Sequence, residues 1–403
     1  MPESIVPHRS TVTLDNVNGD LEVEEHAVIR SEHAQLRVTG TIYCEDDCTF
    51  ECGLSAENLN GEGFIAIRGD LEIKDRVSIE DGRLIVSGRM KANELDVDQS
   101  VEVAGDFEVE ETDVGGSLRV DGNISAKKID VGGTLEVKGL VRATSIDVGG
   151  SIAIDNKLEA EEIDVGGSGS VKGGKVGKID AGGSFVSNDS LEFENIDVGG
   201  TVKLTGENIG KDIDVGGSCK VDGNIKFETL DVGGVIEISG TAEGKDIDVG
   251  GRVYVGKQLR LLGELDVGGK AEIGERLSAE KIDVGGSLKA REALVTSDVD
   301  VGGFIETSNG VTAESVKIGR RGEVKGLIHA KEVIVGERAR VEDIYADEII
   351  LEEKAQARNL YGRNIHLEYK CEILGEVLYT EDMDAEEGVH FARSPRKVEK
   401  LPQ

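Results

Sequence analysis

The residue placed most regularly for chemistry in this chain is an aspartate that recurs in the pattern Ile-Asp-Val-Gly-Gly or a close variant of it. Successive copies lie 17 residues apart, as from 113 to 130, with one step of 16 and one of 18. Carboxylate oxygens are the ligands that calcium and magnesium prefer. The spacing differs from that of GGxGxD-type calcium rolls. Asp130, Asp147 and Asp164 are the residues that would hold cations if the column binds them. The full column is Asp113, Asp130, Asp147, Asp164, Asp180, Asp197, Asp214, Asp231, Asp248, Asp266, Asp283 and Asp300.

Two interpretations of the column compete. Carboxylates stacked about 4.8 Å apart repel by roughly 1 kcal/mol in bulk water and by about 3 to 4 kcal/mol at an effective dielectric of 20. A charge-assisted hydrogen bond that the Asp147 carboxylate accepts from the amide of Gly149 or Gly150 is worth about 1.5 to 3 kcal/mol. Because these energies are comparable, we favour a structural role in locking the corner and keep a cation-binding stripe as the alternative.

Three cysteines, Cys44, Cys48 and Cys52, have the spacing C-x3-C-x3-C, which raises the question of a metal site. No histidine lies at a ligand spacing, and the cysteines fall where the apolar pattern points inward, as do Cys219 and Cys371. Buried cysteine packs as a small hydrophobic residue. Five cysteines are an odd number, which argues against a disulfide framework and indicates a reducing compartment.

Catalysis has little support in the residue pattern. The six histidines, at 8, 26, 33, 329, 366 and 390, form no Ser, His, Asp or metal constellation, and His329 and His366 are expected to point outward. One enzyme class remains as an alternative, a left-handed β-helix acyltransferase with a histidine base. The consistent six-residue repeat of that class is missing, so the sequence predicts a protein that is not an enzyme and needs no cofactor.

These residues are carried by a repeating unit, of which Thr134–Gly150 is one copy. Its apolar residues form three short runs of period two, which indicates strands that are too short for helices. Glycine in the column of Gly139 tolerates positive φ at a corner. We therefore predict a parallel β-helix with three short strands per turn of about 17 residues, whose inward residues in this copy are Leu135, Val137, Val141, Ala143, Ile146 and Val148.

The composition excludes several classes of function. All four prolines lie near the ends, which leaves residues 8–394 free for continuous strand pairing. A formal net charge of -34 argues against nucleic acid and anionic membranes as partners. The chain shows neither a signal-peptide pattern nor an apolar run of about 18 residues, which argues against direct membrane insertion and predicts a cytoplasmic location.

The pattern divides the chain into one long repeat and two tails. We expect about 20 turns, which at about 4.8 Å each would make a rod on the order of 100 Å long. The predicted parts are a polar tail at 1–13, a single β-helix at 14–380, and an acidic then basic tail at 381–403. Within the β-helix, irregular turns occupy 14–99, the aspartate array occupies 100–303, and turns without the aspartate occupy 304–380.

The last of these parts contains VKIGRRGEVKGLIHAKEVIVGERARVEDIYADEI, residues 316–349. With its turns of 16 to 18 residues and its Val-Ile-Gly corners, the chain resembles the bactofilins, polymer-forming cytoskeletal proteins. The resemblance implies a right-handed parallel β-helix that assembles end to end into nonpolar filaments without a nucleotide. It also suggests that self-association uses an open end of the helix, where Ile373, Val377 and Leu378 form the last regular turn and Phe391 could shield the edge or join the contact. A rod-shaped scaffold that does not polymerise remains the alternative.

Overall fold

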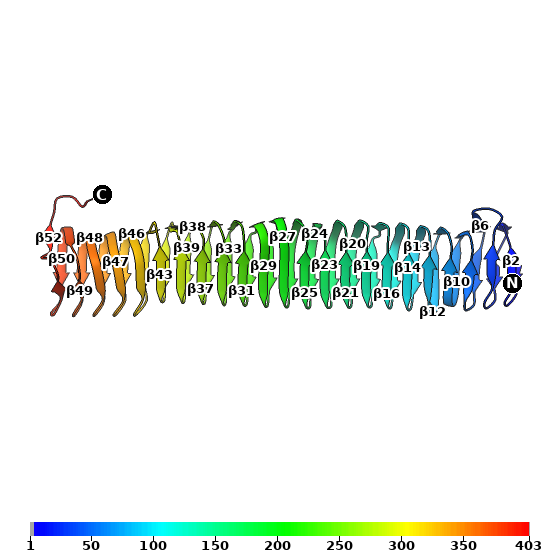
Figure 1. Ribbon diagram of the computed structural model, residues 1–403, viewed down its shortest axis with the longest axis horizontal. Coiled ribbons are helices and arrows are strands. Elements are labelled where there is room, and N and C mark those ends of the chain that lie inside the picture. The colour runs from blue at the N-terminus through cyan, green and yellow to red at the C-terminus, as the bar shows by residue number, and fades with distance from the viewer. Residues whose placement is uncertain (1–3, 403) are drawn as a thin grey trace. The chain divides into compact units, whose positions relative to one another are not determined.

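The computed structural model describes residues 4–402, in which every regular element is a β-strand and none is a helix. The strands form a parallel β-solenoid of about 23 turns with a spacing of about 17 residues. The chain divides into two compact units, one ending at Gly200 and the other beginning at Thr201. In each unit, successive turns follow one another in chain order (Figure 1).

The first unit contains strands β1 to β26. Their bounds are β1 (Ser4–Val6), β2 (Thr11–Thr13), β3 (Asn16–Val17), β4 (Leu21–Val23), β5 (Val28–Arg30), β6 (Gln35–Val38), β7 (Thr41–Cys44), β8 (Cys48–Phe50), β9 (Gly53–Ala56), β10 (Asn58–Ile67), β11 (Leu71–Ile73), β12 (Arg76–Val86), β13 (Met90–Val97), β14 (Ser100–Val103), β15 (Phe107–Val114), β16 (Ser117–Val120), β17 (Ile124–Ser125), β18 (Lys128–Val131), β19 (Thr134–Val137), β20 (Val141–Val148), β21 (Ser151–Ile154), β22 (Leu158–Val165), β23 (Ser168–Val171), β24 (Gly174–Ala181), β25 (Ser184–Ser187) and β26 (Leu191–Val198).

The second unit contains strands β27 to β52. Their bounds are β27 (Thr201–Ile209), β28 (Asp212–Val215), β29 (Ser218–Lys226), β30 (Thr229–Val232), β31 (Val235–Ile238), β32 (Ala242–Gly244), β33 (Asp246–Val249), β34 (Arg252–Val255), β35 (Leu259–Leu261), β36 (Glu264–Val267), β37 (Lys270–Ile273), β38 (Arg276–Ala279), β39 (Lys281–Val284), β40 (Ser287–Ala290), β41 (Glu292–Val295), β42 (Asp298–Val301), β43 (Phe304–Thr307), β44 (Val311–Thr312), β45 (Ser315–Ile318), β46 (Glu323–Val335), β47 (Arg340–Leu351), β48 (Gln356–Leu367), β49 (Glu372–Ile373), β50 (Val377–Ala385), β51 (His390–Phe391) and β52 (Arg396–Lys397).

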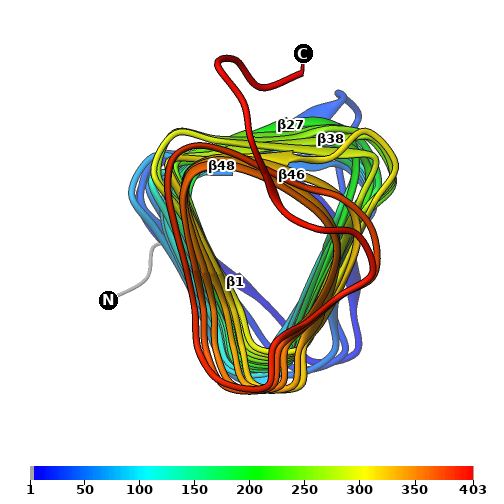
Figure 2. The ribbon, with the colours of Figure 1, turned by 90° about the vertical axis from the view of Figure 1, so that its left-hand side faces the viewer.

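Each turn pairs in parallel with the equivalent residues of the next turn. In the first unit, Ile146 lies in register with Ile129 on one side and with Ile163 on the other. In the second unit, β46, β47 and β48 pair in the same way, and Figure 2 shows their turns nested on one another along the axis. The repeat read from the sequence is therefore the stacking unit of the fold.

The core consists of the inward residues of these strands. Leu135, Val137, Ile146 and Val148 are all buried, as the period-two pattern predicts. Ala143 was also predicted to point inward, but it is half-buried. It lies in β20 where the strand approaches a corner, so its small side chain is left at the margin of the core.

Glycine is needed at the corners because successive turns approach each other closely. A Cβ atom on Gly149 would lie 2.4 Å from the carbonyl oxygen of Gly132. The column of Gly139 was expected to hold residues that tolerate positive φ, but Gly139 itself is not in the positive-φ region. Close approach explains glycine there, because a Cβ would lie 2.2 Å from the oxygen of Gly122. Gly223 in that column does have positive φ, at 152°.

A different corner replaces the glycine pair outside the aspartate array. Arg338 and Lys354 take the left-handed conformation, with φ of 60° and 61°. The amide of the residue before each is capped from the next turn, since Glu337 N donates to the Glu352 carboxylate at 3.0 Å and Glu353 N donates to that of Glu368 at 3.0 Å. These glutamates satisfy amides that the tight corner turns away from the backbone ladder.

The two segments predicted to be tails take part in the solenoid. Residues 1–3 lie outside the described residues, but β1 and β2 pair with β4 and β5. At the other end the acidic run continues β50, and β51 and β52 pair with β49 and β50. Pro7 and Pro395 stand between strands, where a missing N–H breaks no ladder. Their presence marks corners here and does not mark the limit of the fold.

Candidate functional site: the aspartate column and the last turns

The structure brings the recurring aspartates into direct register. In the first unit Asp130 pairs with Asp113 on one side and with Asp147 on the other, and Asp147 pairs with Asp164. In the second unit the pairs run without a gap from Asp214 to Asp300. Each carboxylate therefore has like-charged neighbours one strand spacing away, about 4.8 Å.

This arrangement makes several of the carboxyls harder to ionise. The pKa of Asp147 is raised from its ordinary value, first by partial burial and then by the charges of Asp130 and Asp164. Burial, followed by neighbouring aspartates, raises the pKa of Asp113, Asp231 and Asp266 in the same direction. The column thus concentrates negative charge that the fold does not neutralise in full.

A few cations lie beside the column. Lys128 Nζ is 3.4 Å from Asp130 Oδ2, and Lys178 Nζ is 2.5 Å from Asp180 Oδ2. In the second unit the register position after Asp300 is Lys317, whose Nζ lies 3.7 Å from Asp300 Oδ2. The like charges stop where this lysine enters the column.

The hydrogen bond expected to lock the corner is not the one that forms. Gly149 N donates to the carbonyl of Val131 at 2.9 Å, and Gly150 N donates to that of Gly133 at 3.0 Å. The amides are thus used by the backbone of the preceding turn, and Asp147 makes no bond to them. The corner-locking interpretation is wrong for this reason: close stacking at glycine lets each turn satisfy the next without a side chain.

The aspartate column was also considered as a metal site. Within residues 4–402, no group of three or more His, Cys, Asp or Glu side chains is placed to hold a metal ion. Asp130, Asp147 and Asp164 are stacked in one line rather than gathered around one point. Such a line can attract cations by its field, but it offers no coordination shell.

The cysteines are buried, as the inward pattern predicts. Cys48 Sγ donates to the carbonyl of Glu45 at 3.1 Å, and Cys371 Sγ donates to that of Glu352 at 3.0 Å. A hydrogen bond with Cys48, followed by burial, holds the pKa of the Cys44 thiol well above its usual range. The Cys44 thiol therefore stays protonated and is a poor nucleophile and a poor metal ligand, whereas the same hydrogen bond lowers the pKa of Cys48.

Four of the histidines are paired with carboxylates of neighbouring turns. The Nδ1 atoms of His26 and His33 lie 3.1 Å from Asp47 and Asp15, and His366 Nδ1 lies 3.2 Å from Asp384. His8 Nδ1 lies 3.6 Å from Glu25. These contacts join successive turns at the surface. The Asp15 carboxylate that pairs with His33 also accepts a hydrogen bond from the Ser31 hydroxyl at 2.6 Å.

His329 belongs to a feature that the sequence analysis missed. Its ring stacks on Tyr345 with centroids 5.1 Å apart, and Tyr345 stacks on Tyr361 at 4.4 Å. The three residues are in register in β46, β47 and β48. The signal was available, because positions 329, 345 and 361 follow the 16-residue step of these turns.

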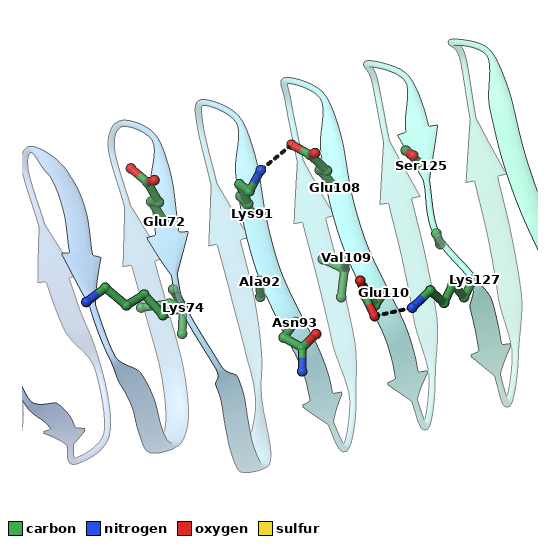
Figure 3. Close-up of a pocket in the computed structure, with 12 residues that line it drawn as sticks. Glu72, Lys74, Lys91, Ala92, Asn93, Glu108, Val109, Glu110, Ser125 and Lys127 are labelled. Carbon is green, nitrogen blue, oxygen red and sulfur yellow. Dashed lines mark hydrogen bonds and ion pairs between the residues drawn. The ribbon is translucent and has the colours of Figure 1, made fainter.

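The outer surface of the first unit contains a shallow hollow of about 530 Å³. Figure 3 shows two ion pairs among its side chains, Lys91 with Glu108 at 3.1 Å and Lys127 with Glu110 at 2.5 Å. The charged side chains of Glu72 and Lys74 line it as well. Asn93 and Ser125 also line it. Both ion pairs join one turn of the solenoid face to the next.

The predicted assembly residues lie under the last strands. Ile373 and Val377 are 0% exposed and Leu378 is 7% exposed, while Phe391 is half-buried. Phe391 is in register with Ile373, and therefore covers it. The structure places three of the four residues one turn inside the final strands.

Comparisons with protein-family models, with curated proteins and with solved structures found no match. No helix in the described part of the chain is long and apolar enough to cross a membrane.

Proposed function

We propose that this chain is a non-enzymatic structural protein of the cytoplasm, whose copies associate end to end into filaments without a nucleotide. We infer further that its turns form one right-handed parallel β-helix with three short strands per turn, elongated as a rod. Two facts support the architecture: residues 128–131, 134–137 and 141–148 are successive strands, and they pair with the next turn. The handedness and the mode of assembly follow from the resemblance to bactofilins.

One observation carries the proposal of assembly, and it concerns the third strand segment of the last full turn. Asp382 to Ala385 pair with Asn364 to Leu367 on one side, and no strand within residues 4–402 pairs with their other side. Met383, which points inward there, is half-buried, whereas its register partner Ile365 is 2% exposed. An edge of this kind is a template for the strand of another chain.

The electrostatic repulsion between copies favours filament growth along the axis of the solenoid. The charge of -34 is distributed over the flanks in outward columns, so two rods lying side by side repel each other over about a Debye length. Contact at an end involves backbone groups and apolar side chains over a short range. Association at the ends should therefore persist when salt screens the flanks.

Negative-stain electron microscopy of the purified protein tests this proposal. We expect filaments whose length grows with protein concentration across a sodium chloride series without added nucleotide. Single particles at every concentration and salt would contradict assembly and would favour a rod-shaped scaffold that does not polymerise.

The aspartate column supports a second candidate, a solenoid that binds divalent cations along one face. The pKa of Asp147 is raised first by partial burial and then by the charges of Asp130 and Asp164, and this concentration of negative charge would attract divalent cations. Isothermal titration of the protein with calcium at constant ionic strength tests it. No heat beyond that of a monovalent control would exclude this function.

A further inference from the structure

Two short strands lie over the edge of the last full turn of the second unit. β51 pairs with β49, where Phe391 is in register with Ile373, and β52 pairs with β50, where Arg396 is in register with Leu378. We call residues 390–398 the strap. Figure 2, which looks onto this end of the second unit, shows the chain crossing the preceding turn before it leaves the solenoid.

The strap covers an apolar surface without becoming part of the core itself. Ile373, Val377 and Leu378 are buried beneath it. Two apolar residues of the strap, Phe391, which is in register with Ile373, and Val398, are only half-buried. Removing the strap would therefore expose three core residues together with the unpaired outer edges of β49 and β50.

The attachment of the strap is weak compared with that of the turn beneath it. β50 has seven residues in register with β48, whereas β51 and β52 each have two residues in register with their partners. Pro395 stands between the two short strands and has no N–H with which to add a backbone bond there. Segments with few backbone bonds and little buried apolar area open at low free energy.

Charge holds the strap in place. Arg396 forms an ion pair with Glu376, and Lys397 Nζ donates to the carbonyl of Glu381 at 2.8 Å. The strap is basic and lies next to an acidic run, Glu381 to Glu387, in a chain with a net charge of -34. Exposed ion pairs of this kind weaken as salt rises.

We propose that the strap is an autoinhibitory cover for the surface through which copies associate, released as ionic strength rises. This inference rests on the end-to-end assembly proposed above and adds its regulation. With the strap in place, only the segment Asp382 to Ala385 of the last full turn offers a free strand edge among the described residues. The rest of the contact is closed because Ile373, Val377 and Leu378 are buried. With the strap released, the edges of β49 and β50 are open for its strands.

Full-length variants test the cover from both directions. Arg396→Glu with Lys397→Glu reverses the charges that hold the strap, and Arg393→Glu with Lys400→Glu is the matched control with the same change in net charge. Glu372→Cys with His390→Cys joins a register pair on the outer face, where parallel neighbours are close enough for a disulfide. The readouts are filament length by negative-stain microscopy across a sodium chloride series and hydrogen exchange of the strap amides.

We expect the charge-reversal variant to form filaments at a sodium chloride concentration about threefold or more below that needed by the parent. The control should behave as the parent does. The oxidised cysteine variant should form no filaments at any salt, and a reducing agent should restore them.

Filaments of parental length from the oxidised cysteine variant would overturn the cover and leave end-to-end assembly standing. A charge-reversal variant whose strap amides exchange faster than those of the parent, but which stays single at every salt, would overturn the cover and the proposed assembly together.

Discussion

Neutralising one member of the aspartate column should stabilise the protein at neutral pH. Asp147→Asn removes two like-charge contacts, with Asp130 and with Asp164, while leaving the strand pairing unchanged. At about 4.8 Å and the dielectric of bulk water, each contact is worth roughly 0.9 kcal/mol, or about 2 kcal/mol for both. The water value is the appropriate one because Asp147 is an exposed side chain.

Screening and a nearby cation reduce this gain. At 0.1 M salt the Debye length of about 10 Å removes roughly a third of the repulsion over one strand spacing. Lys128 attracts Asp147 in the parent, and the variant loses that attraction. We therefore expect a net stabilisation of about 1 kcal/mol, or an increase in melting temperature of about 2 °C.

The stabilisation by Asp147→Asn should depend on pH, because the pKa of Asp147 differs between the folded and the unfolded chain. The pKa of Asp147 is raised above 3.8 in the folded chain, so the folded chain keeps this proton to a higher pH than the unfolded chain does. The carboxyl adds stability below pH 3.8, and that stability is lost as the pH rises through the raised pKa. The variant should therefore melt above the parent at pH 7 and level with it well below pH 3.8.

Melting followed by circular dichroism at pH 7 and at low pH, in low and high salt, measures the effect. Glu136→Gln is the matched control, because Glu136 is an outward acid of the same unit that lies 3.3 Å from Arg119 and should lose stability when neutralised. A variant at Asp147 that melts below the parent by the same amount at both pH values would refute the repulsion argument. It would mean that this carboxylate makes a local bond that supports the turn.

Three further predictions concern the core, the corner and the ions. Val141→Asp buries an unpaired carboxylate at a site that is 1% exposed, which should destabilise the protein by several kcal/mol. The control Ser125→Asp, on the outer face, should melt close to the parent. Equal melting temperatures of the two variants would contradict the strand assignment. Gly149→Ala places a Cβ 2.4 Å from the oxygen of Gly132 and should lower the free energy of unfolding in urea by about 1 to 3 kcal/mol. An unchanged midpoint of urea unfolding would show that the corner can relax. Millimolar calcium should raise the melting temperature of the parent more than sodium at equal ionic strength if the column binds cations, and an equal response would exclude that binding.

The parts of the fold that could be predicted are those fixed by local pattern. Ile146 and Val148 alternate with polar residues, and Gly149 and Gly150 recur at the step of the turn, so the sequence itself contains the period, the buried face and the position of the corner. The repeat also implies the register of Asp147 with Asp130, because equal turns must stack residue on equivalent residue.

The ends could not be predicted in this way, because their strands depend on an edge that is already built. β51 and β52 have two residues each and no sustained alternation, and they pair because β49 and β50 offer unsatisfied backbone groups. Near the other end, Leu21 pairs with Ile42, a step longer than the usual turn, since the chain between them includes an extra loop. Pattern analysis at a fixed step loses the register at such an insertion.

The prediction of a hydrogen bond between Asp147 and the corner amides was wrong, and the reason is related. The expected partner of Asp147 was chosen within its own turn, whereas the competing acceptor for the Gly149 amide is Val131 of the preceding turn. Two turns must be stacked before that carbonyl is in reach. A side-chain bond within one turn is visible in the sequence, and a backbone bond between turns becomes visible only in the fold.

The aspartate column differs from the other outward columns in a way that bears on the proposed filaments. Beside it, charges alternate along the stack, so that Arg142 lies 2.9 Å from Glu159 and Lys175 forms an ion pair with Glu192. Alternating charges make neighbouring turns attract each other, whereas a run of aspartates makes them repel. An uncharged residue in place of the aspartate would serve the corner equally well, since the corner amides bond to backbone carbonyls. The column therefore weakens the stack while adding negative charge to one flank. In a protein whose copies associate at their ends, that is where like charge is useful, because it opposes contact between flanks and leaves the axial contact as the favoured one.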